Sequence, residues 1–483
     1  MEIDKVIDST VEPVSNAVAS VVFYSVQLLD LEIKLILIWL VAAALFFTVY
    51  LGFINIRYFK HAIDVLRGKH DSGNSNGHIS RFQALMTSLS ATIGLGNIAG
   101  VAVAISVGGP GATFWMAIMG FFSMSTKFVE VTLGIKYRQY GSKHNPNSIS
   151  GGTMYYLRGA FDRLQQPKMG RFMAGLFAVC CIGGTIGAGG LFQANQAYQQ
   201  ALVVTGGEAG FLAGKGWLFG LFMAVLVGMV IIGGIQWIAA VAGRIVPVMA
   251  IIYIIAGFVV IGVHYTEIPD ALRTIFEMAL YPQAGIGALM GALLMGVQRA
   301  TFSNEAGLGS SAIAHSAVKT DVPVSQGMVA MLGPFIDTVV VCMVTALVIV
   351  ISGTYVEGGG IEGVQLASRA FASGISWFPY VLSLTVFLFA YSTMISWSYY
   401  GLICTTYLFG ERLVITGLYK ILFCAFIIIG ASAQLSNIIL FTDSMVFAMA
   451  IPNIIGLYML APEIKNDLRV YLQDLKEKTE KRA

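Results

Sequence analysis

The sequence has few charged residues. Asp, Glu, Lys and Arg make up 11% of its 483 residues, whereas a soluble domain usually carries about 25%. Hydrophobic residues make up 57%, and the mean hydropathy is +0.76. This composition excludes a water-soluble globule and indicates a protein that crosses a membrane many times.

Paired cysteines and the common catalytic motifs are also missing. The five cysteines lie inside apolar stretches without a C-x-x-C spacing, which is typical of buried small side chains and not of disulfides or metal centres. The sequence contains no zinc motif, no G-x-S-x-G elbow and no G-x-x-x-x-G-K-[ST] nucleotide loop. An intramembrane enzyme and an ATP-driven pump are therefore disfavoured, and we expect neither enzymatic activity nor an organic cofactor.

Long apolar runs are what the sequence does contain. About 20 apolar residues in a helix are enough to cross the hydrocarbon core of a bilayer. We therefore expect an all-α polytopic membrane protein with eleven transmembrane helices. They are predicted at residues 32–56, 82–107, 111–136, 172–203, 215–235, 241–264, 286–314, 325–352, 377–408, 414–432 and 437–460.

Basic residues gather in alternate loops. The loops after the odd-numbered spans and the C-terminal tail hold most of the Lys and Arg, whereas the other segments hold only Lys5, Lys34, Lys215, Arg273 and Arg369. Basic loops remain on the cytoplasmic side of a membrane. We therefore expect a multi-pass protein of the cell membrane, with its N-terminus outside and its C-terminus in the cytoplasm.

The first thirty residues mix acidic residues with short apolar pieces and lack a basic start. We therefore expect an extracellular segment here and no cleavable signal peptide. Within it, Val14, Val18, Val21, Val22 and Leu29 predict one face of a short interfacial helix.

Two segments of the chain resemble each other. ATIGLGNIAG (91–100) and EAGLGSSAIA (305–314) each place a GLG inside a predicted span, and the two spans run in opposite directions. Five spans follow from each start, as in inverted-repeat transporters. The expected division is an N-terminal segment (1–30), an extra helix with a cytoplasmic loop (31–79), a first repeat (80–265), an extracellular connector (266–285), a second repeat (286–460) and a basic tail (461–483).

The glycines of these two segments have two explanations. A glycine inside a helix costs about 1 kcal/mol relative to alanine. Small residues allow helices to pack closely, but a glycine cluster also allows a helix to unwind. An unwound stretch is tolerated in a membrane where it lines a cavity, and its free N–H and C=O groups can then bind a carboxylate or a cation.

Side chains with oxygen atoms flank both segments. Oxygen ligands of low charge suit an alkali cation such as sodium, and no His/Cys cluster indicates another metal. The flanking residues are Ser90, Thr92 and Asn97 at the first segment, and Thr301, Ser303, Asn304, Ser310 and Ser311 at the second.

Charged groups inside the spans need partners, because a charge at the bilayer centre costs about 2.5–3.5 kcal/mol. Lys127 and Glu130 are three residues apart on one helix, and we expect them to pair with each other. Asp337 has no partner nearby in sequence. Glu305 is either a ligand or coupling group, or part of a network that holds the broken helix in shape.

Two further spans carry polar groups. TIGAGGLFQAN (185–195) in the fourth span contains Gln193 and Asn195. FAYSTMISWSYYG (389–401) in the ninth span contains Thr393 and Trp397, which share one helix face. A hydroxyl bonded to its own helix and a packed tryptophan are the plainer explanations of these last two residues.

Three motifs resemble the alanine or glycine:cation symporter family of the amino acid–polyamine–organocation superfamily. They are FSNEAGLGSSAIAHSA (302–317), GGPGATFWMAIMG (108–120) and ATIGLGNIAGVA (91–102). The resemblance extends over about residues 80–460 and implies a LeuT-like fold, with a 5+5 inverted repeat and one extra N-terminal helix. It departs from the family at Ala117, where a second tryptophan is usual, and at Leu95, where many members have threonine.

The resemblance also implies roles for individual residues. Phe302 would close the site as a lid, and Thr301, Ser303, Asn304 and Glu305 are candidates for gating or coupling. Sodium would bind near Ser90, Ile93, Ser392 and Thr393. The substrate would contact Gly94, Leu95, Gly96, Asn97, Gln193, Phe302, Thr393 and Trp397.

Together, the residues and the resemblance predict a sodium-coupled symporter for small neutral amino acids such as alanine and glycine. Proton coupling in the same fold is one alternative. An ion channel is an alternative of another class, although a potassium-type filter needs a re-entrant loop repeated fourfold. The expected partners are the amino acid, sodium and the lipid bilayer, and not nucleic acid. The oligomeric state is left open.

Overall fold

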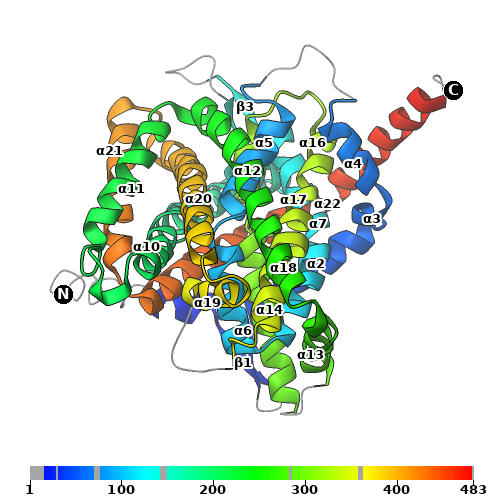
Figure 1. Cartoon of the computed structure of the whole chain (residues 1–483). Coiled ribbons are helices and arrows are strands. Elements are labelled where there is room, and N and C mark those ends of the chain that lie inside the picture. The colour runs from blue at the N-terminus through cyan, green and yellow to red at the C-terminus, as the bar shows by residue number, and fades with distance from the viewer. Residues whose placement is uncertain are drawn as a thin grey trace.

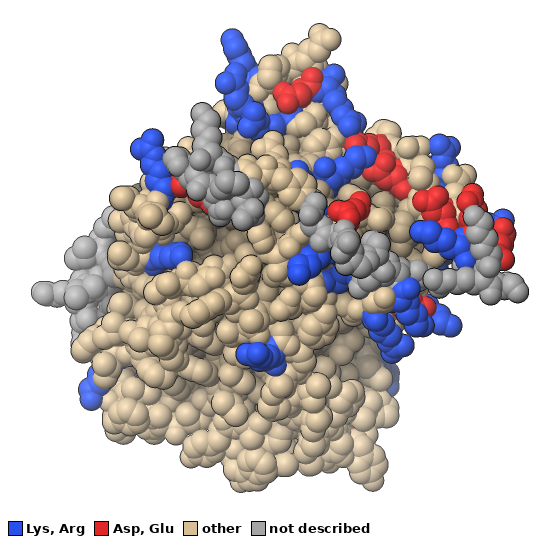
Figure 2. Space-filling view, turned by 90° about the horizontal axis from the view of Figure 1, so that it is seen from above, with Lys and Arg blue, Asp and Glu red and all other residues tan. Residues whose placement is uncertain are grey.

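Long helices run side by side through most of the molecule, as Figure 1 shows. The computed structural model describes residue 13 and residues 16–28, 31–69, 77–141, 149–281, 285–356 and 363–480. β3, α4 and the C-terminal end of α22 lie at the top of Figure 1, and β1, α6 and α13 lie at the bottom. Figure 2 looks onto the top and shows several groups of Lys and Arg side chains there. We call this the basic end and the opposite one the far end.

The N-terminal part precedes the two repeats. β1 (Ser25–Leu28) and β2 (Leu31–Lys34) form an antiparallel pair that the sequence did not predict. The expected interfacial helix falls partly outside the described residues, which exclude Val14 and Leu29, whereas residues 16–22 are helical. The segment continues with α2 (Leu35–Tyr50), α3 (Ile54–Arg57) and α4 (Phe59–Leu66).

The first broken helix has the interruption that its glycines predict. α5 (Arg81–Thr92) starts at a capping box made by Ser80 and Gln83, and it stops before the glycines. The short turn η1 (Leu95–Asn97) and α6 (Ala99–Gly108) follow, at an angle of 57° to α5. The rest of this part of the chain comprises α7 (Gly111–Lys136), β3 (Gln139–Tyr140), β4 (Ile149–Ser150), α8 (Thr153–Arg163), α9 (Pro167–Gly184), η2 (Thr185–Leu191), α10 (Phe192–Val204), η3 (Gly207–Ala209), α11 (Gly216–Ile231), α12 (Gly234–Val263), η4 (Tyr265–Glu267) and α13 (Ile268–Leu280).

The second broken helix consists of α14 (Ile286–Asn304) and α15 (Ser311–Ser316). α7 packs against α6, α14 and α15, so it contacts both broken helices. The chain then continues through α16 (Pro323–Ala330), α17 (Leu332–Pro334), η5 (Phe335–Cys342), α18 (Met343–Ile351), α19 (Val364–Gly374), α20 (Phe378–Phe409), α21 (Leu413–Ser432) and α22 (Leu435–Glu480).

Two spans contain π-helical turns, η2 and η5, which are frequent at functional sites. In η2 the glycines allow α20 to approach closely, because a Cβ on Gly189 would lie 2.4 Å from the Cβ of Trp397. The glycine-rich TIGAGGL stretch therefore positions Trp397.

Seven helices in the described part of the chain are long and apolar enough to cross a membrane, or eight if α5 and α6 count as one bent span. The remaining predicted spans correspond to the shorter apolar helices α2 and α11 and to the interrupted pair α14–α15. The structure is thus that of a helical membrane protein, and the number eleven stays a prediction. One boundary differs clearly: the last helix was expected to end at residue 460, but α22 continues to Glu480.

Candidate functional site

At the first break, the backbone is held by one side chain of the break itself and by one from α10. Asn97 Oδ1 accepts a hydrogen bond from Gly94 N (3.0 Å), and Gln193 Oε1 accepts one from Leu95 N (3.1 Å). A Cβ on Gly94 would lie 2.5 Å from Thr393 Oγ1, so a larger residue there would displace the Thr393 side chain. The helix is therefore interrupted here, and its backbone amides are within reach of side-chain oxygens.

The second break is held from α7, α8 and α22. Gly307 and Gly309 adopt left-handed backbone angles, as does Glu305 (φ 56°), which is uncommon for a residue with a side chain. Gly309 N donates to Glu130 Oε1 (3.0 Å), and Asn453 Nδ2 donates to Gly307 O (2.8 Å). The polar backbone groups that the break exposes are thus satisfied within the protein, as a membrane interior requires.

Lys127 and Glu130 do not make the local pair that was expected. Lys127 Nζ donates to Asn304 O (2.7 Å), while Glu130 accepts from Gly309 N and from Asn453 Nδ2 (2.6 Å). Both side chains therefore brace the second break. Glu305 accepts a hydrogen bond from Ser310 and lies within coulombic range of Lys127.

Asp337 connects the two breaks. Its Oδ1 accepts from Asn97 Nδ2 (2.5 Å), and its Oδ2 accepts from Ser303 Oγ (2.7 Å) and Thr338 Oγ1 (2.8 Å). The sequence showed this carboxylate without a partner. Thr338 is the adjacent residue, but Ser303 on α14 and Asn97 at the first break are 34 and 240 residues away, so local sequence contained no signal for these two.

The C-terminal end of α5 meets α20 through oxygen atoms. Thr393 Oγ1 donates to Ser90 O (2.9 Å), Ser90 Oγ donates to Ser392 O (2.6 Å), and Ser392 Oγ donates to Phe389 O (3.1 Å). Trp397 Nε1 donates to the next carbonyl, Ala91 O (3.3 Å). Carbonyls at a helix C-terminus carry partial negative charge, so this group of oxygens suits a cation.

Phe302 lies against the first break. A Cβ on Gly96 would be 3.4 Å from its ring, and its ring packs edge-on against Phe192 with centroids 5.7 Å apart. The guanidinium of Arg299 lies over the same ring, 5.2 Å from the centroid. The aromatic ring therefore separates the break from Arg299.

Arg299 forms a buried ion pair that sequence reasoning missed. Its guanidinium contacts Asp443 on α22, and the two side chains are 3% and 5% exposed. Gln298 Nε2 also donates to Asp443 (2.9 Å), and Lys34 Nζ lies 3.5 Å from Gln298 Oε1. A carboxylate inside the apolar run 437–460 was the available signal, because a charge in a span needs a partner.

The predicted site residues come together at the two breaks and are buried. Thr301 is buried too, with no hydrogen-bond partner for its hydroxyl in the described residues, and Asn304 donates to Thr338 Oγ1 (3.1 Å). Asn195 lies elsewhere, because its amide donates to Gly430 O and Ala433 O at the end of α21. The roles of these residues in binding stay predictions.

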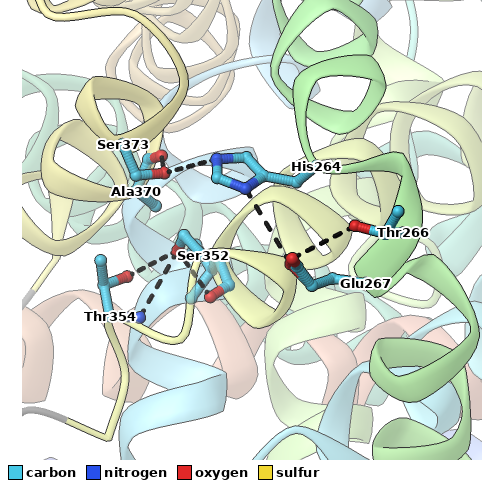
Figure 3. A network of polar contacts seen from close by, with 8 residues as sticks. His264, Thr266, Glu267, Ser352, Thr354, Ala370 and Ser373 are labelled. Atoms are coloured by element: carbon cyan, nitrogen blue, oxygen red, sulfur yellow. Dashed lines mark hydrogen bonds and ion pairs between the residues drawn. The ribbon is translucent and has the colours of Figure 1, made fainter.

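A second polar network, shown in Figure 3, lies where α12, η4, α18 and α19 end. His264 faces Glu267 at 4.0 Å and Ser373 Oγ at 3.5 Å, and Glu267 is 52% exposed. These contacts are long and partly open to solvent, so they connect chain segments and do not build a site. Within the ranges that the structure describes, no group of three His, Cys, Asp or Glu residues is arranged to hold a metal ion.

Comparison with known proteins agrees with this architecture. The chain is 38% identical over 438 residues to the sodium/alanine symporter AgcS of Methanococcus maripaludis, covering 90% of this chain and 93% of that one. It is 36% identical over 360 residues to the probable sodium/glutamine symporter GlnT of Bacillus subtilis, covering 74% and 71% of the two chains.

The fold also has a relative among solved structures. The crystal structure of MhsT in complex with L-phenylalanine superposes with a TM-score of 0.50 at 14% identity, covering 80% of this chain and 99% of that one. This likeness shows a LeuT-like fold. The sequence profile of the sodium:alanine symporter family matches residues 16–483, and the chain belongs to that family of transporters.

Proposed function

We propose that this protein imports alanine, glycine or another small neutral amino acid together with sodium, by alternating access. Family membership supports sodium-coupled amino-acid symport. The observation that carries the finer proposal is the pair of helix breaks, which meet at a closed polar centre with large side chains around it. The centre offers amides and oxygen atoms, and the large side chains of Leu95, Phe302 and Trp397 are buried there.

The substrate carboxylate is assigned to the first break. Leu95 N donates a hydrogen bond to a side-chain oxygen of Gln193 at 3.1 Å. This contact supports the assignment, because the same amide could donate to a carboxylate oxygen. Backbone amides at the start of a half-helix are suited to a carboxylate. Gly94 and Gly96 allow a ligand to approach the backbone, and Asn97 fixes the turn.

Sodium is assigned to the oxygens between α5 and α20. The ligands would be the carbonyl oxygens of Ser90 and Ile93 and the hydroxyls of Ser392 and Thr393. The observed Thr393–Ser90 and Ser392–Phe389 hydrogen bonds support this assignment, because they bring neutral oxygen atoms together at a helix C-terminus. A hard cation prefers such ligands.

Substrate size is assigned to Leu95, Phe302 and Trp397. All three are buried, and Phe302 packs against Gly96 while Trp397 packs against Gly189. Large residues at these positions leave room only for a substrate with a small side chain. Leu95, where many family members have threonine, makes the wall of the substrate site more apolar.

Closure at the two ends is assigned to two ionic groups, both of which include α22. At the far end, Arg299 and Asp443 lie beyond Phe302. At the basic end, Glu463 on α22 pairs with Lys136 (2.6 Å) and Arg163 (2.7 Å). Alternating access requires these two groups to separate in turn, so that the site opens to one side at a time.

The membrane arrangement that goes with this proposal has eleven spans, in two inverted repeats (80–265 and 286–460) behind one extra helix. The concentration of Lys and Arg at the basic end supports a cytoplasmic position for that end. The N-terminus would then lie outside the cell and the C-terminus inside.

Uptake into liposomes tests the proposed function. Purified protein is reconstituted, and labelled alanine, glycine and phenylalanine are supplied under an inward sodium gradient, an inward proton gradient, or neither. We expect accumulation of alanine and glycine, not of phenylalanine, under the sodium gradient alone. Accumulation driven by protons without sodium would show that the coupling ion is the proton and not sodium. Ion current without substrate accumulation would indicate a channel.

A further inference from the structure

A groove outside the transport site runs between the N-terminal helices and the extended part of α22. It has a volume of about 1120 Å³ and lies at the basic end. One side is formed by Val49, Tyr50 and Tyr58 at the ends of α2 and α3, and the other by residues 462–476 of α22. Figure 1 shows this end of α22 leaving the body beside α3 and α4.

The charges of the groove all have one sign. The residues that line it include Lys465, Arg469 and Lys476, but no Asp or Glu. Together with Leu472 they follow an i, i+4, i+7, i+11 spacing, so they share one face of the helix.

Three acidic residues of the same helix lie on the opposite face. Glu463, Asp467 and Asp474 follow the same spacing, half a turn away. Asp467 pairs with Lys136 (2.5 Å), and Asp474 lines a separate small pocket with Arg81. These three carboxylates therefore lie away from the groove, whose charged lining residues are all cations.

The cations in the groove are available to a ligand. Lys465 Nζ lies 4.2 Å from the centre of the Tyr50 ring, and Arg469 Nη2 donates to the neutral Asn466 Oδ1 (2.8 Å). Lys476 has a carboxylate nearby, Glu480 at 3.7 Å, on an exposed surface. An Arg with N–H groups to spare recognises phosphate oxygens in pairs.

Apolar surface adjoins the cations. Val49, which lines the groove, is 64% exposed, and the neighbouring Phe53 and Ile56 are 43% and 58% exposed. Tyrosines and snorkelling lysines are typical of the level where lipid headgroups meet acyl chains. The groove therefore places cations beside exposed apolar surface.

We propose that this groove is a binding site for an anionic phospholipid. The phosphate of the headgroup is held by Lys465 and Arg469, with Lys476 nearby, and an acyl chain follows α2 past Val49. His61 on α4 fixes the wall of the groove through a hydrogen bond to Tyr471 (2.8 Å). The lipid would thus tie the extra N-terminal helix to α22.

Native mass spectrometry of the delipidated full-length protein in detergent tests the proposal. Phosphatidylglycerol and phosphatidylcholine with the same acyl chains are titrated separately. We expect one phosphatidylglycerol to bind with clear preference over phosphatidylcholine. Lys465→Gln with Arg469→Gln should weaken that binding by roughly 30-fold, because each Lys or Arg near an anionic lipid contributes a factor of about 5.

Two controls separate this site from general surface charge and from loss of fold. Lys168→Gln with Arg171→Gln removes two exposed cations at the start of α9 and should leave binding unchanged. Lys465→Arg keeps the charge and should bind like the wild type. Equal binding of phosphatidylcholine, or equal loss in the Lys168 and Arg171 variant, would overturn the proposal.

Inorganic phosphate distinguishes a lipid from a free anion. Thermal unfolding is measured with phosphatidylglycerol, with phosphatidylcholine and with inorganic phosphate. We expect the midpoint to rise only with phosphatidylglycerol, and only when Lys465 and Arg469 are present. An equal rise with inorganic phosphate would show a free-anion site and refute the lipid assignment.

Discussion

Neutralising Asp443 tests how the far end is closed. Asp443 accepts from Arg299 and Gln298, and the ion pair is almost fully buried. Asp443→Asn keeps the shape of the side chain but leaves Arg299 as a buried cation without a counter-ion. Removing one partner of a buried ion pair costs about 3–5 kcal/mol, which corresponds to a population change of roughly 150- to 5,000-fold.

That penalty applies to the closed arrangement, because water can solvate Arg299 once the far end opens. The variant should therefore shift towards the form that is open at the far end. A cysteine at Thr442, which is 1% exposed, reports this opening through its rate of labelling by a membrane-impermeant maleimide. Cys424, the one cysteine among the five that is not buried, is first replaced by alanine. Labelling should accelerate by more than about tenfold.

A double substitution separates charge from packing. Arg299→Gln with Asp443→Asn leaves no uncompensated charge, so slow labelling should return. An unchanged rate in Asp443→Asn alone would refute closure by this pair. A double variant that labels as fast as the single one would show that packing, and not charge compensation, holds the far end closed.

Substitutions at three further positions address the site and the basic end. Gly94→Ala should reduce sodium-driven alanine uptake to background, because its Cβ would lie 2.5 Å from Thr393 Oγ1. The variant should still elute as a folded species in gel filtration. Normal uptake would contradict the tight geometry of the break. Thr393→Val should raise the sodium concentration for half-maximal uptake by roughly tenfold, because the lost free energy is about that of one hydrogen bond. Thr393→Ser keeps the hydroxyl and should not change that concentration. Identical behaviour of the two variants would exclude a role of Thr393 as an oxygen ligand. Glu463→Gln should lower thermal stability by no more than about 1 kcal/mol, because its partners Lys136 and Arg163 are 31% and 55% exposed; a loss several times larger in a calorimetric scan would mean that the network holds the fold itself.

The breaks in the two spanning helices were predictable from the chain, because glycine is costly inside a helix and its clustering is a local signal. The polar residues beside the breaks were equally visible, and Thr393 and Trp397 share a face that follows from helical spacing alone. The family resemblance then added the fold. These features depend on neighbouring residues, which a sequence displays directly.

The partners across the fold were not predictable in the same way. Lys127 and Glu130 have the spacing of a local pair, but each forms a hydrogen bond with the second break. Lys127 bonds to a backbone carbonyl there and Glu130 to a backbone amide. The carboxylate of Asp443 inside an apolar run signals that it needs a partner, but neither Asp443 nor Asn453 indicates which residue that partner is. Their roles depend on contacts of α22 with the second broken helix, and only the structure shows those contacts.

The length of α22 was underestimated for a similar reason. The apolar run stops near residue 460, but the helix continues to Glu480. Beyond it, Leu468 is buried and Tyr471 bonds to His61. Tertiary packing therefore continues the helix past the hydrophobic segment, and the same continuation creates the groove at the basic end.

Equilibrium binding of labelled alanine to the purified protein, with and without sodium and without any gradient, tests the central claim most directly. The account predicts that sodium lowers the Kd for alanine, because sodium at Ser90, Ile93, Ser392 and Thr393 and the amino acid at the first break occupy adjoining positions. It also predicts that Thr393→Val shifts this effect of sodium to a roughly tenfold higher sodium concentration. An affinity for alanine that is the same with and without sodium would contradict the account.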